Sequence, residues 1–108
     1  MNFVNSKSDI EELINNNKIV LLYFGSNNCN VCTAMKPKVK EILEEFPKIK
    51  SVQIDVEKSL EISASYEIFT IPAILIFIEG KEIIREARYI SIQNLREKID
   101  RYYNMIFD

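Results

Sequence analysis

The chain has 108 residues, a length at which a single domain can bury enough apolar surface to fold on its own. Its hydrophobic content of 47% and charged content of 28% are ordinary for a soluble globular protein. With 14 basic and 16 acidic residues in no long block of one sign, the net charge of −2 argues against a nucleic-acid partner and against an anionic membrane partner.

No part of the sequence is expected to cross a membrane or to direct secretion. The longest apolar stretch, Ile71–Ile78, is far shorter than a bilayer span and contains a proline. The first residues, Met1–Ser6, lack the basic segment and apolar core of a signal peptide. We therefore expect a single domain, residues 1–108, in the cytoplasm.

The first quarter of the chain predicts a strand, a helix and a second strand. Phe3–Val4 is a candidate for a short strand. Ser8 and Glu11 fit a capping box, so a helix is expected to begin at Ser8 and to end in Asn15–Asn17. The unbroken apolar run Ile19–Gly25 predicts a strand that is buried on both faces.

A long helix is predicted after this strand. Apolar residues recur there at steps of three and four, the pattern of a helix with one buried face: Val31, Met35, Val39, Ile42, Leu43 and Phe46. Pro37 lies within the pattern and removes a helix hydrogen bond, so a kink is expected there.

The second half of the chain predicts a strand over Ile49–Val56, a short helix from Ser59 and then a β-hairpin. Pro72 is expected to open the first hairpin strand, because a proline inside the ladder loses a hydrogen bond. Ser91 is the expected cap of a last helix. Its predicted inward face comprises Leu95, Ile99, Tyr102 or Tyr103, and Ile106. The order β-α-β-α-β-α-β-β-α predicts an α/β fold, a three-layer sandwich around a mixed sheet.

The two cysteines of the chain, Cys29 and Cys32, stand where the buried strand ends and the long helix begins. The first N–H groups of a helix lack internal partners and, with the helix dipole, favour an anion. A thiol at this point is therefore expected to ionise more readily than a free one. Residues three apart share a helix face, which brings the sulfurs within disulfide range. One thiol can attack a disulfide, and the other can resolve the mixed disulfide.

With this Cys-x-x-Cys motif and with Ile71-Pro72 opening the hairpin, the chain resembles the thioredoxin family over nearly its whole length. The element order, Pro37, Asp55 after a strand and the hairpin residue Gly80 also match that family. The resemblance implies the thioredoxin fold and a thiol–disulfide oxidoreductase, with the first cysteine as exposed nucleophile and the second as resolving thiol.

The resemblance also implies how a substrate is held. It implies a cis peptide bond at Ile71-Pro72 facing the cysteines, and in the family the backbone before that proline pairs with the substrate chain. Asn28, Asn30 and Val31 around the cysteines, together with Arg88 on the expected substrate-facing loop, complete the predicted substrate-binding set.

The chain departs from the family pattern at its site. Thioredoxins proper carry Trp-Cys-Gly-Pro-Cys, whereas this chain has Asn28-Cys29-Asn30-Val31-Cys32 and no tryptophan. The family's buried aspartate, thought to take the proton of the resolving cysteine, falls at Tyr23, and the lysine often paired with it falls at about Ser51. A glycine of the substrate-facing loop falls at Arg88. These departures favour a narrower set of partners and a slower release of the substrate.

The leading hypothesis is a small cytoplasmic protein disulfide reductase, a monomer without cofactor or metal, in electron transport and cell redox homeostasis. The resemblance implies a flavoprotein reductase of the thioredoxin type as its source of electrons. Two alternatives stay open: a binding module that rarely turns over, and a metal or iron–sulfur carrier that uses Cys29 and Cys32 across a dimer. A third possibility is that the two cysteines are unreactive core residues.

Overall fold

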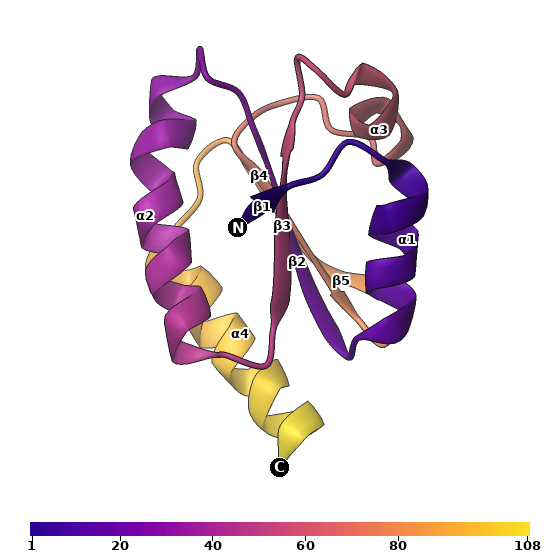
Figure 1. The fold of residues 1–108 in the computed structure, drawn as a ribbon. Coiled ribbons are helices and arrows are strands. Elements are labelled where there is room, and N and C mark those ends of the chain that lie inside the picture. Colours follow the sequence, from indigo (N-terminus) through magenta and orange to yellow (C-terminus); the bar gives the residue numbers. More distant parts are fainter.

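The computed structural model describes residues 1–108, and its elements follow the predicted order (Figure 1). The strands are β1 (Asn2–Phe3), β2 (Ile19–Gly25), β3 (Lys50–Asp55), β4 (Ala73–Ile78) and β5 (Lys81–Ala87). The helices are α1 (Lys7–Asn16), α2 (Asn30–Glu45), α3 (Leu60–Ser65) and α4 (Ile92–Phe107). None of these helices combines the length and the apolar character needed to span a bilayer.

The strands form one mixed sheet in the order β1-β3-β2-β4-β5. The pairs β1–β3 and β2–β3 are parallel, whereas β2–β4 and β4–β5 are antiparallel. In this register Gly25 at the end of β2 lies beside Asp55 at the end of β3, and Phe24 lies beside Ala73 at the start of β4. The segments that leave β2, β3 and β5 and the segment that enters β4 therefore meet at one edge of the sheet.

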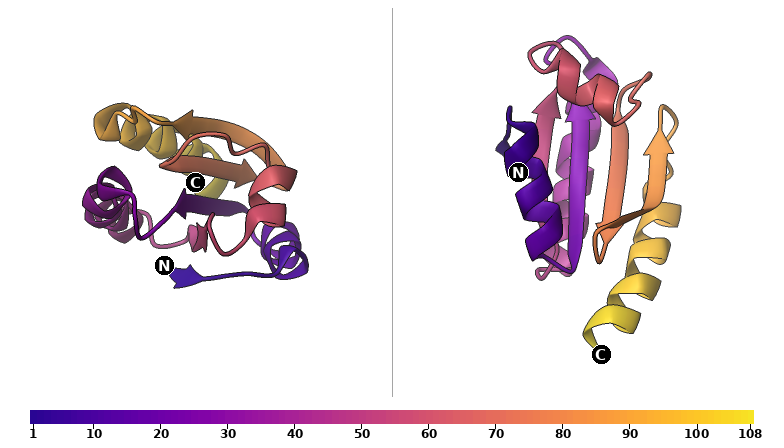
Figure 2. Two further views of the ribbon diagram at one scale, coloured as in Figure 1. Left: turned by 90° about the horizontal axis from the view of Figure 1, so that it is seen from above. Right: turned by 90° about the vertical axis from the view of Figure 1, so that its right-hand side faces the viewer.

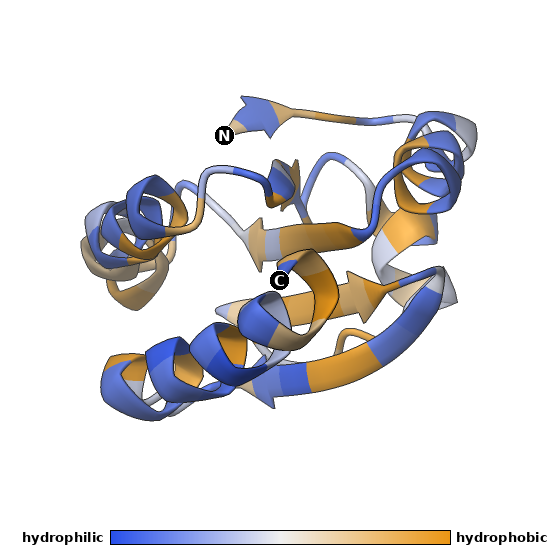
Figure 3. Cartoon of the chain, turned by 90° about the horizontal axis from the view of Figure 1, so that it is seen from below, coloured by the Kyte–Doolittle hydropathy of each residue, from blue (hydrophilic) through white to orange (hydrophobic).

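Helices cover both faces of the sheet, which confirms the predicted three layers (Figures 1 and 2). α2 and α4 pack on one face and α1 and α3 on the other. Successive side chains of β2 alternate between the two faces, with Leu21 and Tyr23 toward α2 and α4 and with Leu22 and Phe24 toward α1 and α3. Every residue of β2 is buried, as the unbroken apolar run predicts, and Figure 3 shows the apolar colour along this central part of the sheet.

β3 has an apolar face and a polar face. Val52 and Ile54 pack with the α1 and α3 side of the core. Their neighbours Ser51, Gln53 and Asp55 pair in register with the residues of β2 that face α2, so these three point toward α2. The strand predicted over Ile49–Val56 therefore carries polar groups into the space between the sheet and α2.

Two sequence predictions need correction. α1 is capped by Ser6 and not by Ser8, because the Oγ of Ser6 accepts a hydrogen bond from the N–H of Asp9 at 3.3 Å. Both serines are followed three residues later by an acid, Asp9 or Glu11, so the capping pattern fits two registers. The predicted helix end in Asn15–Asn17 is confirmed.

The second correction concerns the buried face of α2. Val31, placed on that face by the sequence pattern, is 57% exposed. The buried positions are Cys32, Val39, Ile42 and the cap residue Phe46, with Met35 packed against the same cluster. Counted from Cys32 through Met35, these positions keep the steps of three and four, whereas Val31 points outward beside the cysteines.

The last helix follows its prediction closely. The Oγ of Ser91 accepts from the N–H of Asn94 at 3.2 Å, which confirms the cap. Leu95 and Ile99 are buried and contribute to the core on the α2 side of the sheet. The Tyr103 hydroxyl accepts from the N–H of Lys48 at 3.2 Å, which ties α4 to the segment after α2.

Candidate active site

Cys29 and Cys32 form a disulfide at the N-terminus of α2, with their Cα atoms 5.2 Å apart. Cys29 is the N-cap residue, and its Sγ accepts a hydrogen bond from the N–H of Cys32 at 3.1 Å. The C=O of Cys29 accepts from the N–H of Thr33 at 3.1 Å, which starts the helix. The Cys29 sulfur thus occupies the position where the unpaired N–H groups of a helix favour negative charge.

The two sulfurs differ in access. Cys29 is partly exposed, whereas Cys32 is only 2% exposed and packs against the end of β2. A Cβ placed on Gly25 would stand 3.1 Å from the Cβ of Cys32 and 3.4 Å from its Sγ. Glycine at this position therefore lets the first turn of α2 lie directly on the sheet.

Tyr23 on β2 holds the first turn of α2 against the sheet. It is 1% exposed, and its hydroxyl donates to the C=O of Cys32 at 2.5 Å. Burial raises the pKa of Tyr23 to about 12, so the phenol is neutral at physiological pH. The buried hydroxyl has the partner that it needs, and it is a donor to the helix backbone and not a base toward the thiol.

The segment before β4 lies at the same edge of the sheet, and its Ile71-Pro72 peptide bond is cis, as predicted. Ile71 is half-buried, and its backbone takes part in none of the backbone–backbone hydrogen bonds. The C=O of the next residue, Pro72, accepts from the N–H of Arg88 at 2.9 Å. The unpaired N–H and C=O of Ile71 can therefore be offered to another chain.

Arg88 follows β5 with a φ of 67°, in the left-handed region that favours glycine. Its guanidinium carbon lies 5.9 Å from the ring centroid of Tyr89, which is 90% exposed. Phe69, before Ile71, is 85% exposed. The sequence reasoning missed these two aromatic side chains, although each stands in a loop outside any buried pattern.

The remaining predicted residues also lie at this edge. The Asn28 amide donates to both carboxylate oxygens of Glu57 at 3.2 Å, which links the segment before α2 to the segment after β3. Asn30 and Val31 are exposed on the first turn of α2. The fold thus gathers every residue of the predicted set at one edge: Asn28, Cys29, Asn30, Val31, Cys32, Ile71, Pro72 and Arg88.

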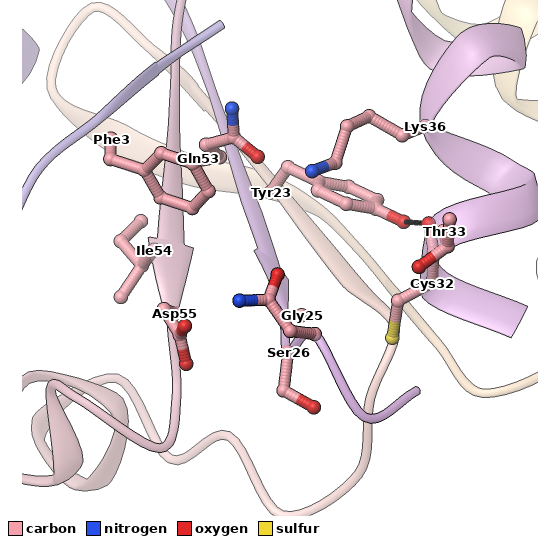
Figure 4. A pocket seen from close by; sticks show the side chains of 11 residues that line it. Phe3, Tyr23, Gly25, Ser26, Cys32, Thr33, Lys36, Gln53, Ile54 and Asp55 are labelled. Carbon is pink, nitrogen blue, oxygen red and sulfur yellow. Dashed lines mark hydrogen bonds between the residues drawn. The ribbon is translucent and has the colours of Figure 1, made fainter. Parts of the chain in front are cut away.

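A small polar cavity lies behind Cys32, between α2 and β3 (Figure 4). It has about 20 Å³ of space open to water, enough for one molecule. Its lining includes Tyr23, Cys32, Lys36, Gln53 and Asp55. The sequence reasoning noted Asp55 only as a family match and missed Lys36 on α2 and Gln53 on β3. The alternation of Gln53 and Asp55 along the predicted strand indicated a polar face, but not which element that face meets.

The chain contains no group of three or more histidine, cysteine, aspartate or glutamate side chains placed to hold a metal ion.

Comparison with known proteins identifies relatives that match nearly the whole chain. The family model described as Thioredoxin matches residues 2–101. The thioredoxin-like protein YdfQ of Bacillus subtilis is 33% identical over 105 residues, which cover 97% of this chain and 94% of that protein. A thioredoxin of Mycoplasmoides gallisepticum is 30% identical over 97 residues, covering 90% of this chain and 97% of that protein.

Solved structures show the same fold. The X-ray structure of Fasciola hepatica thioredoxin has a TM-score of 0.84 and 28% identity, covering 94% of this chain and 98% of that one. Oxidised mitochondrial thioredoxin 3 of Saccharomyces cerevisiae has a TM-score of 0.84, covering 94% of each chain, but only 20% identity.

The raised pKa of Tyr23 predicts a pH-dependent stability. Because the folded pKa of about 12 lies above the ordinary value of 10.0, the fold favours the protonated phenol. This contribution to the free energy of unfolding is complete below pH 10.0 and is lost as the pH rises through about 12. Tyr23→Phe should weaken this alkaline loss and, at neutral pH, cost about 1 kcal/mol for the missing hydrogen bond.

Urea denaturation across pH checks this expectation, with Tyr89→Phe as the control on an exposed tyrosine. Equal alkaline slopes in the wild type and Tyr23→Phe would show that Tyr23 is not held neutral by the fold.

Proposed function

Because the chain belongs to the thioredoxin family and is a thiol–disulfide oxidoreductase, we propose that it reduces disulfides in other proteins, with Cys29 as nucleophile and Cys32 as resolving thiol. The observation that carries this division of labour is the difference in placement between the sulfurs. Cys29 caps α2 and is accessible. Cys32 lies one turn further along the helix, is 2% exposed, and forms the disulfide with Cys29.

The reaction has two exchanges. The Cys29 thiolate attacks one sulfur of a substrate disulfide, forming a mixed disulfide and releasing the other substrate sulfur as a thiolate. Cys32 then loses its proton and attacks the Sγ of Cys29, so the Cys29–Cys32 bond forms and the mixed disulfide breaks. The substrate leaves with both sulfurs reduced, and the protein is left in the disulfide state that the structure contains.

Several groups at the edge of the sheet are suited to hold the substrate chain. The unpaired backbone of Ile71 can form strand-like hydrogen bonds with it, and Pro72 fixes that segment beside Arg88. Val31 and the exposed rings of Phe69 and Tyr89 offer apolar contact around Cys29. Asn28 and Asn30, the exposed neighbours of Cys29 in the chain, supply polar contacts.

The partners in this proposal are protein disulfides and, for regeneration, a flavoprotein reductase of the thioredoxin type. Neither exchange needs a bound cofactor, because the thiols of Cys29 and Cys32 supply the two electrons that reduce the substrate disulfide. Every residue of the mechanism comes from one chain, so a monomer suffices. We place the reaction in the cytoplasm, where cellular systems keep thiols reduced, and regard it as a step of electron transport in cell redox homeostasis.

Replacement of each cysteine separates the two exchanges. Cys29→Ser should abolish disulfide reduction because the accessible nucleophile is gone. Cys32→Ser should still attack but should accumulate a mixed disulfide, because no thiol remains to resolve it. Insulin reduction with dithiothreitol as the source of electrons measures turnover, and mass spectrometry without reductant detects the trapped partner.

The two variants serve as each other's control, since each loses one thiol. A trapped partner on Cys32 in Cys29→Ser, and none on Cys29 in Cys32→Ser, would reverse the assignment. Undiminished insulin reduction in both variants would contradict the proposed function itself.

Arg88 generates a second prediction, on stability and on partner choice. Because its φ is 67°, Arg88→Gly should stabilise the fold by roughly 1 kcal/mol. The same change removes a positive charge beside Pro72, so reduction of peptides with an acidic residue next to the target cysteine should slow by up to about fivefold. Arg88→Lys is the control, because it keeps the charge and the unfavourable φ.

Stopped-flow reduction of paired acidic and neutral peptide disulfides, at low and high salt, measures the effect. Unchanged selectivity and unchanged salt dependence in Arg88→Gly would remove the charge from the account of partner choice. An unchanged or lower free energy of unfolding in Arg88→Gly would contradict the claim that the positive φ of Arg88 destabilises the fold.

A further inference from the structure

The second exchange requires a proton acceptor for a buried thiol. Cys32 is 2% exposed, and burial in apolar surroundings disfavours the thiolate that must attack the mixed disulfide. Tyr23 is neutral, and its hydroxyl donates a hydrogen bond to the Cys32 carbonyl oxygen. The chain contains no histidine. The acceptor must therefore be another group that can reach the inner side of Cys32.

The register of the sheet points to Asp55. Gly25 contacts Cys32, and Asp55 is its partner on the neighbouring strand, about 4.8 Å away between strands. Paired residues of neighbouring strands project to the same face, so the Asp55 side chain points to the α2 side of the sheet, where Cys32 and Tyr23 lie.

The cavity connects these two side chains. Cys32 and Asp55 both line it, with room between α2 and β3 for one water molecule (Figure 4). Asp55 also lines a wider hollow on the surface, together with Asn5, Lys58 and Ser59. Because Asp55 lines both spaces, its carboxylate can receive a proton from the cavity that Cys32 lines and release it to the surface hollow.

The carboxylate has one oxygen occupied and one available. Its Oδ1 accepts from the N–H of Glu57 at 2.9 Å, which fixes the side chain, and its Oδ2 makes no hydrogen bond within the chain. Although Asp55 is only 8% exposed, Oδ2 can accept from a water in the cavity.

Few charged or titratable groups surround the Asp55 carboxylate. α2 contributes Lys36, whose Nζ lies 5.4 Å from the ring centroid of Phe3 on β1. β2 contributes the neutral Tyr23, and the segment after β3 contributes Glu57 and Lys58. The positive charge of Lys36, which lines the same cavity, favours a thiolate at Cys32 as it forms.

We propose that Asp55 is the proton acceptor for Cys32 during resolution, acting through one water in this cavity. The S–H proton of Cys32 passes by way of the water to the Asp55 carboxylate, and the Cys32 sulfur attacks the Sγ of Cys29. The Cys29–Cys32 bond forms, the bond from Cys29 to the substrate breaks, and the substrate leaves as a thiolate. The protonated Asp55 then releases its proton to solvent through the outer hollow. This inference rests on the proposed function, because it assigns a residue to its second exchange.

Asp55→Asn tests the assignment, because the amide oxygen can still accept from the N–H of Glu57 while the side chain no longer accepts a proton. Reduced protein is mixed with dithiobis(nitrobenzoic acid), an aromatic disulfide that releases one coloured thiolate on attack by Cys29 and a second on resolution by Cys32. The two stopped-flow phases then report the two exchanges separately. Asp100→Asn, an exposed change of the same kind on α4, is the matched control.

The first phase should be unchanged in Asp55→Asn, and the second should slow by about 10²-fold near neutral pH, the lower end of general-base catalysis. The slowed phase should also rise with pH more steeply than in the wild type, because hydroxide replaces the lost acceptor. An unchanged second phase with an unchanged pH profile would overturn the proposal. Equal slowing of both phases would also overturn it, since Asp55 would then act on the fold. If the wild type lacks the first phase, the proposed function itself fails.

Discussion

The contact between the first turn of α2 and the end of β2 is the constraint on which the site depends. Cys32 lies against Gly25, and the buried Tyr23 hydroxyl holds the Cys32 carbonyl oxygen. This contact buries one sulfur and leaves the other at the helix cap. The two cysteines therefore differ in solvent access and in electrostatic surroundings. Two successive exchanges require this difference, because one thiol must attack first and the other must resolve.

The sheet supplies the rest of the arrangement. Because β2 is parallel to β3 and antiparallel to β4, the end of β3 and the start of β4 both meet the end of β2. The side toward β4 presents the unpaired backbone of Ile71 to the surface. On the side toward β3, the polar side chains Gln53 and Asp55 line the cavity beside Cys32, which larger apolar side chains would have filled. In the proposed mechanism, the substrate and the proton therefore reach the two sulfurs from different sides.

The sequence predicted the order of elements, the sheet class and the position of the cysteines, because those depend on apolar periodicity and on turn and cap residues. It placed the cap of α1 at Ser8 and not at Ser6, since two serines satisfied the same local rule. It placed Val31 in the core, because a helical pattern alone does not tell where the buried face begins. The cavity around Asp55 depends on which face of β3 meets α2, and that follows from strand pairing between distant segments. The sequence alone could not supply it.

Cys29 at the helix N-cap should be the thiol that reacts first, and competitive alkylation of the reduced wild-type protein measures this most directly. Iodoacetamide is added in limiting amount across a range of pH, and mass spectrometry locates the modified sulfur. Cys29 should be modified ahead of Cys32, and it should remain reactive at pH values at which a free cysteine is mostly protonated. Modification of Cys32 first, or a Cys29 that reacts no faster than a free cysteine at any pH, would contradict the account.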